Sequence, residues 1–350
     1  MNSEAQPNLC YNISSYIGFA MLCFLYGTSY GIAILGLKHY PGATLIALRM
    51  EFAFGTSVLI FLIRSIIDRN LFNTACETLC NNKIDMLKSA FGGIMYYGFP
   101  HSLIGVAQRT IASNTVHIAQ SCVPFFAFIF ANFLLPDEKF SCHTFYPQVL
   151  AVIGTTLTTI PTMESPWHET PSVWDYIFLF VAIASFGFGS VYMKSGLANV
   201  EPNMCGIFQL FGSAIFSTCF ALGYDKPKVF AKSISESTGV TILWPLILGS
   251  CHTCGCTYVY LWVVKRLGAV ISSFSNFGQI VLGVLIGVIF FQEWANYKTK
   301  DFILSGLGLG ILCLAIICGF LGPTPKNQVP NIQKSQSFMS DEGILLYTGE

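Results

Sequence analysis

The chain has 350 residues, of which 53% are hydrophobic and 10% are charged, and its mean hydropathy is +0.60. Soluble domains carry roughly 25% charged residues, so this composition excludes a water-soluble protein and indicates one embedded in lipid. The 18 basic and 18 acidic residues cancel, and we therefore expect no nucleic-acid partner.

Residues 1–15 contain no basic stretch before the first apolar run, so we interpret that run as a retained membrane span and not as a signal peptide. A span needs roughly 20 mainly apolar residues, and this template fits the chain about ten times. The predicted spans lie near residues 16–36, 43–66, 89–108, 114–135, 145–162, 174–195, 203–223, 240–264, 269–291 and 302–321. The longest interior break between them runs from Asp68 to Lys88.

Two features within the spans are unusual. Pro124 falls inside the fourth run and predicts a kink or a local opening of that helix. Arg49 and Glu51 are charges inside the second run, and because they are two residues apart they diverge on a helix. A charge inside a span is either a coupling charge or a structural charge. Glu51 could carry a coupling proton, whereas the alternative for Arg49 is a structural role in anchoring the fold.

The polar tail, residues 322–350, is predicted to be disordered. It carries Asp341, Leu345 and Leu346 at the spacing of an acidic dileucine sorting signal, which favours an endolysosomal or vacuolar membrane, with the plasma membrane as the alternative. The loops on the side of the two termini contain more basic residues than the loops on the other side. Because basic residues are more frequent in cytosolic loops, we expect both termini in the cytosol.

Residues 107–157 and 262–314 repeat one order of features, in which Arg109 corresponds to Arg266 and Glu138 to Glu293. A weaker echo relates GTSYGIAILGLKHYP in the first run to GFGSVYMKSGLANVEP in the sixth. We therefore predict an all-α polytopic membrane protein with two five-helix repeats, residues 16–162 and 174–321. Five is odd, so the second repeat enters the membrane inverted, which is the architecture of alternating-access carriers.

These residues resemble the EamA-type branch of the drug/metabolite transporter superfamily. The resemblance rests on YGTSYGIAILGLKHYP, ALRM with Arg49, ASNTVHIAQSCVP, LLPDEK and RLGAVISSFSNFGQIVLGVLIGVIFFQEW, in that order and spacing. It implies ten helices, cytosolic termini and a central cavity lined by helices one, three, four, six, eight and nine. It does not name a substrate.

Polar and amphipathic aromatic side chains within the spans are candidates for lining this cavity, because they cost free energy in a bundle core unless they are paired or wetted. Asn114, His117 and Gln120 share one helical face, and Ser273, Asn276 and Gln279 form the corresponding stripe in the second repeat. The remaining candidates are Tyr26, Thr28, Tyr30, Tyr96, Tyr97, His101, Tyr192, His252, Tyr258 and Tyr260. Interhelical hydrogen bonding and interfacial aromatic belts are the structural alternatives for these residues.

We expect a secondary transporter, a carrier or exchanger of a small polar or amphiphilic metabolite. A nucleotide-sugar-like carrier of the same superfamily and a non-transporting membrane sensor or interaction protein on the same fold are the alternatives. No catalytic residues, metal site or cofactor are predicted, and an enzyme is not expected. The expected partners are the small-molecule substrate and the lipid bilayer; glycines on the last helix are equally compatible with a homodimer and with packing inside one chain.

Overall fold

The computed structural model describes residues 9–111, 116, 119–135, 142–160, 172–197, 200, 202–267, 272, 274–290 and 297–321. Every regular element within these ranges is helical. The first half contains α1 (Leu9–Leu37), α2 (Gly42–Ile67), α3 (Arg69–Asn81), α4 (Lys83–Gly93), η1 (Ile94–Gly98), α5 (Phe99–Ala107), α7 (Val123–Leu134) and α8 (Cys142–Thr159). The second contains α9 (Val173–Gly196), α10 (Pro202–Tyr224), α11 (Pro227–Ser235), α12 (Leu243–Ile247), η3 (Leu248–Cys254), α13 (Gly255–Leu267), α15 (Ser275–Phe290) and α16 (Thr299–Leu321).

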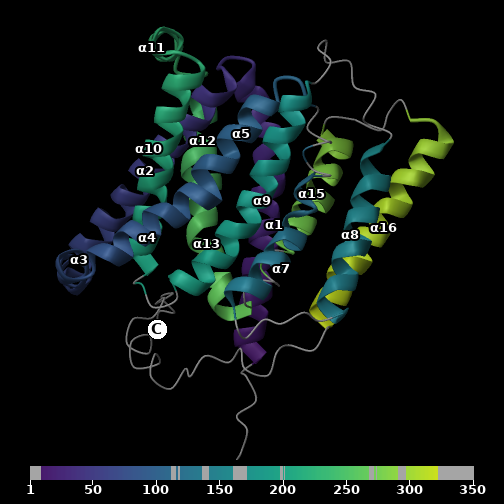
Figure 1. Cartoon of the computed structure of the whole chain (residues 1–350), viewed down its shortest axis with the longest axis horizontal. Coiled ribbons are helices and arrows are strands. Elements are labelled where there is room, and N and C mark those ends of the chain that lie inside the picture. Colours follow the sequence, from purple (N-terminus) through teal and green to yellow (C-terminus); the bar gives the residue numbers. More distant parts are fainter. Residues whose placement is uncertain are drawn as a thin grey trace, which may run out of the picture.

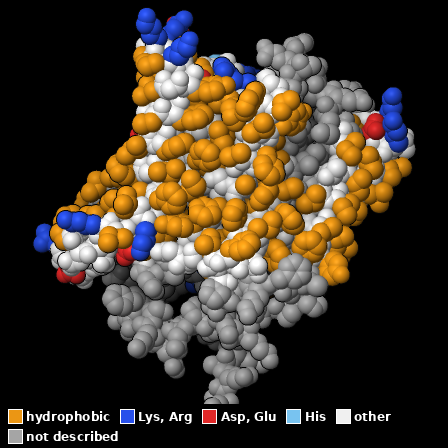
Figure 2. Space-filling model, in the orientation of Figure 1, with side chains coloured by type: hydrophobic (Ala, Val, Ile, Leu, Met, Phe, Trp, Pro, Cys, Tyr) orange, Lys and Arg blue, Asp and Glu red, His pale blue; other side chains and the backbone are white. Residues whose placement is uncertain are grey.

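Six described helical segments are long and apolar enough to cross a membrane, and α7 and part of α15 are shorter apolar helices. Many large hydrophobic side chains on these helices are exposed, including Ile66 and Ile67 at 82% each. Figure 2 shows them as an apolar belt over the face of the molecule, with Lys and Arg side chains gathered at its margins. Such a surface is stable in hydrocarbon and not in water.

The ten predicted apolar runs all fall on helical segments, although the fourth, fifth and ninth lie only partly within the described residues. Within the fourth run, the chain turns at Ser121 and Cys122, and α7 then begins with Pro124 in its first turn. Proline is tolerated there because the first backbone N–H groups of a helix have no partner within it.

The predicted break between spans from Asp68 to Lys88 contains the short helix α3, which is not among the six span-length helices. The Asp68 side chain accepts a hydrogen bond of 2.9 Å from the Asn70 backbone N–H and so caps α3. A second short helix, α11, lies between α10 and α12. In Figure 1, α3 and α11 lie at opposite ends of the bundle.

The helices pack in a consistent set of pairs. Contacts are extensive between α1 and α15, between α7 and α9, between α2 and α10, and between α8 and α16. In addition, η1 and α4 pack on α10, while η3 and α12 pack on α2. Elements far apart in sequence therefore lie side by side (Figure 1).

Two glycines allow especially close approach in these pairs. A Cβ atom at Gly93 would overlap the backbone of Gln209 on α10, and a Cβ atom at Gly249 would overlap the backbone of Arg49 on α2. Small residues permit this helix contact because van der Waals packing and not the hydrophobic effect drives association in lipid.

Candidate functional site

The candidate site is built around the two π-helical segments, which interrupt otherwise continuous helices. Tyr96 and Tyr97 lie in η1, between α4 and α5, and His252 and Thr253 lie in η3, between α12 and α13. A π-helix has a wider turn than an α-helix, loosens the regular backbone hydrogen bonding and occurs frequently at functional sites. In η3, the Thr253 hydroxyl donates to the Leu248 carbonyl at 3.0 Å, five residues earlier.

Aromatic rings fill the space beside η1. The ring of Tyr96 meets Tyr97 edge-on, with centroids 4.8 Å apart, and stacks with Tyr260 at 5.1 Å. His101 and Tyr96 both pack edge-on against Phe186 of α9. Tyr96, Tyr97 and Tyr260 are 5%, 2% and 1% exposed, so these rings form a closely packed aromatic centre that joins helices of both halves.

Tyr26 of α1 and His101 of α5 complete this aromatic centre. Tyr26 is partly buried and packs against the core that contains Tyr96, Tyr97 and Tyr260. One imidazole nitrogen of His101, Nδ1, lies 2.8 Å from the Tyr97 carbonyl oxygen, four residues earlier. Nδ1 can only donate in this contact, which leaves Nε2 as the ring's other polar atom.

A polar group adjoins the aromatic centre on the side of η3. Arg49 of α2 is 4% exposed, and its Nε donates to the Thr253 hydroxyl at 2.7 Å. The Nε2 atom of His252 lies 3.0 Å from the Thr28 hydroxyl of α1, and its Nδ1 lies 3.2 Å from the Ile247 carbonyl. Arg49 therefore places a buried cation beside η3.

The second polar group joins α15 to the residues that precede α7. Gln279 Nε2 donates to Gln120 Oε1 at 2.9 Å and to Asn276 Oδ1 at 3.4 Å. Gln120 and Gln279 are both buried, and with Asn276 they are the described members of the two stripes that the sequence placed at corresponding positions. The two stripes therefore meet across the two halves.

Three other candidates lie apart from these groups. The Tyr258 hydroxyl is 2.6 Å from the Ser57 hydroxyl, so it links α13 to α2. Tyr192 packs against Phe91 of α4 and Phe188 of α9, not against the aromatic centre. Glu51 is exposed and accepts a hydrogen bond of 2.7 Å from the Thr218 hydroxyl on α10.

Several sequence candidates lie outside what the structure describes. These are the Tyr30 side chain, Asn114, His117, Ser273, Asp341, Leu345 and Leu346. Two residues of the site were missed by the sequence analysis, Thr253 and Phe186. Thr253 lies in the Cys251–Cys254 stretch, where only its polarity inside an apolar run could have identified it; for Phe186 no sequence signal distinguishes it from other core phenylalanines.

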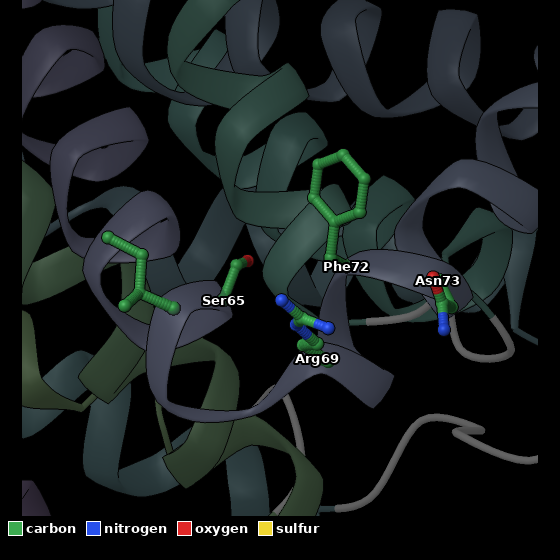
Figure 3. A pocket seen from close by; sticks show the side chains of 5 residues that line it. Ser65, Arg69, Phe72 and Asn73 are labelled. Carbon is green, nitrogen blue, oxygen red and sulfur yellow. The ribbon is translucent and has the colours of Figure 1, made fainter.

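Within the described residues, no group of three or more His, Cys, Asp or Glu side chains is placed to hold a metal ion. A surface hollow of about 480 Å³ lies at the junction of α2 and α3, away from the aromatic centre. Figure 3 shows Ser65, Arg69, Phe72 and Asn73 around it, and Ile66 completes its lining.

Comparison with known protein families gives a match over the second half of the chain. Residues 173–322 match the model of the EamA-like transporter family. The second half of this chain is therefore similar to EamA-like transporters. The resemblance stated from the sequence is thereby confirmed, and with the apolar helices it identifies an integral multi-pass membrane protein.

Structural comparison covers more of the chain than the EamA-like model does. A solved structure described as "Crystal structure of protein" superposes with a TM-score of 0.61 at 17% sequence identity, over 88% of this chain and 98% of that chain. At this identity the likeness concerns the fold alone. A search of curated proteins finds no significant match.

Proposed function

We propose that this protein is a secondary carrier that moves a small polar or amphiphilic metabolite across the membrane by alternating access. In this proposal residues 16–162 and 174–321 are two inverted five-helix repeats, residues 1–15 and 322–350 are cytosolic, and the substrate binds between the repeats. The observation that carries the proposal is the pairing of the helices, which is the same when the two halves are exchanged.

This exchange can be followed helix by helix. Let α1 correspond to α9, α2 to α10, α7 to α15, and α8 to α16. The contact of α1 with α15 then becomes the contact of α9 with α7, and both pairs pack closely. The contact of η1 with α10 becomes that of η3 with α2, which is also present, while the α2–α10 and α8–α16 pairs map onto themselves.

Finer features obey the same exchange. Gly93 approaches the backbone of Gln209, and Gly249, at the corresponding place, approaches the backbone of Arg49. Both halves also carry a π-helix at the same point of the helix and a short surface helix after their second long helix. A pseudo-twofold relation of this kind gives a carrier two conformations of similar energy. In one the site opens to one side of the membrane, and in the other the two halves exchange their roles and the site opens to the opposite side.

The chemistry of the centre supports a solute with polar and flat or apolar parts. Tyrosine rings offer faces for stacking and hydroxyls for hydrogen bonds, and His252, Thr28 and Arg49 add polar groups beside them. The rings fill the space between the halves, so entry of a solute requires α5, α9 and α13 to separate there.

The proposal is tested in two steps. A metabolite panel that includes nucleotide sugars is first screened for ligands that raise the melting temperature of the detergent-purified protein. Each ligand found is then offered in radiolabelled form to proteoliposomes preloaded with the unlabelled compound. We expect saturable counterflow that His252→Ala and Thr28→Val reduce, while Leu59→Ala, on the exposed face of α2, leaves it unchanged.

Two other outcomes would replace the proposal. Stabilising ligands that never cross the membrane would support the non-transporting sensor or interaction protein. Counterflow restricted to nucleotide sugars would support the nucleotide-sugar carrier.

An endolysosomal or vacuolar membrane is part of the proposal, and replacing Leu345 and Leu346 by Ala should then move a fluorescently tagged chain to the plasma membrane.

A further inference from the structure

Helix α3 has an unusual distribution of side chains for a connecting segment. Phe72, Cys76, Leu79 and Cys80 are spaced four, three and one residues apart, so they lie on one side of the helix. All four are exposed. Ala75, on the neighbouring flank, is the one buried residue of α3 and packs toward the core, whereas Asn70, Thr74 and Glu77 occupy the polar side.

The residues around α3 favour a lipid-facing position for this apolar side. The end of α2 contributes exposed Ile66 and Ile67, and the start of α4 contributes exposed Ile84 and Leu87. Arg69 is the first residue of α3 and Lys83 the first of α4, and in Figure 2 basic side chains mark this edge of the apolar belt. A short amphipathic helix with these neighbours lies in the plane of the membrane–water interface, with its apolar side in the acyl region.

Cys76 and Cys80 are one turn apart on that side, and both thiols are exposed. The hollow at the α2–α3 junction is lined by Phe72, one turn before Cys76, so this part of α3 is open to the surroundings (Figure 3). A pair of accessible thiols at the interface of an amphipathic helix is the arrangement that membrane-bound acyltransferases modify.

We propose that Cys76 and Cys80 are sites of reversible S-acylation by long-chain fatty acyl groups. Each Sγ attacks the thioester carbonyl carbon of a fatty acyl-CoA, the new S–C bond replaces the bond to coenzyme A, and the thiol proton leaves with coenzyme A as its free thiol. The acyl chain then enters the bilayer beside Phe72 and Leu79 and fixes α3 to the membrane surface. The inference requires α3 on the cytosolic side, as in the proposed orientation, but not that the protein transports a solute.

Other exposed cysteines provide an internal comparison. Cys219 is also exposed, but it lies within the span of α10, near the end that leads to α11 and away from α3. In the proposed orientation this end of α10 lies on the side of the membrane opposite to the cytosol, where fatty acyl-CoA is not supplied. Cys219 is therefore a matched control for an exposed thiol on the side opposite to α3.

The experiment uses the full-length chain expressed in eukaryotic cells. Free thiols are blocked, thioesters are cleaved with neutral hydroxylamine, and the released thiols are coupled to a polyethylene glycol maleimide that shifts the band on a gel. We expect Cys76→Ser and Cys80→Ser each to lose one mass shift and the double variant to lose two, while Cys219→Ser retains the wild-type pattern.

A further variant tests the role of the helix surface. Leu79→Glu keeps both cysteines but places a charge between them, so we expect it to reduce both shifts. Size-exclusion chromatography verifies that each variant is folded. The proposal is overturned if the wild-type chain shows no hydroxylamine-dependent shift, or if the double variant retains every shift of the wild type.

Discussion

Replacing Gly93 by Ala should destabilise the protein through a single methyl group. The new Cβ atom would overlap the Gln209 carbonyl and Cα atoms, which belong to the backbone of α10 and cannot move independently of that helix. Overpacking of this kind costs about 1–3 kcal/mol, and the gain in helix propensity from Gly to Ala, about 0.5–1 kcal/mol, offsets part of it. The net loss lowers the melting temperature by several degrees.

The symmetry of the two halves makes this prediction sharper. Gly249→Ala should cause a loss of similar size, because its Cβ atom would overlap the Arg49 backbone in the corresponding pair. Gly55→Ala is the matched control, because nothing lies within 4 Å of a Cβ atom there. The higher helix propensity of alanine should therefore leave the stability of this variant equal to that of the wild type or raise it. Melting is followed by intrinsic fluorescence in detergent. If Gly93→Ala melted as high as Gly55→Ala, the close pairing of α4 and α10 would be refuted.

Three further outcomes follow. In a double-mutant cycle of stability, Gln279→Leu and Gln120→Leu should show a coupling free energy of about 0.6 kcal/mol, the average for interhelical hydrogen bonds in membranes. Strict additivity of the two single effects would contradict the 2.9 Å contact between the side chains. Arg49→Lys keeps the charge but loses the Nε donor to Thr253, which should cost about 1.5–3 kcal/mol; a wild-type melting temperature would argue against this bond. Glu51→Gln, on an exposed side chain, should retain counterflow and its pH profile, and a flattened profile would make Glu51 the coupling carboxylate.

The apolar runs of the chain were predictable because lipid imposes one requirement on every span, a helix that satisfies its own backbone. The same argument of residue spacing placed Gln120 and Gln279 on corresponding stripes, and the structure joins them by a hydrogen bond. The EamA-like resemblance, which depended on motif order, is confirmed for residues 173–322.

Other features depend on contacts that no local pattern contains. The π-helices place Tyr96 and His252 in the centre, yet a wider turn leaves no signature in a run that is apolar throughout. Tyr192 is an amphipathic aromatic residue of the kind expected in a site, but its side chain packs against Phe91 of α4. The packing of neighbouring helices, which no local pattern contains, sets this direction. Helix α3 had a signal that was overlooked, the Asp68 cap followed by apolar residues at helical spacing.

The central claim is that the two halves are inverted, and accessibility of α3 and α11 from the two sides of a membrane tests it most directly. In a background with all 13 cysteines replaced, Asn73→Cys on α3 and Lys228→Cys on α11 are each exposed to a membrane-impermeant maleimide in sealed vesicles of one orientation. Five membrane crossings between the two positions predict that only one of them is labelled until the vesicles are opened. Labelling of both from the same side would contradict the inverted arrangement.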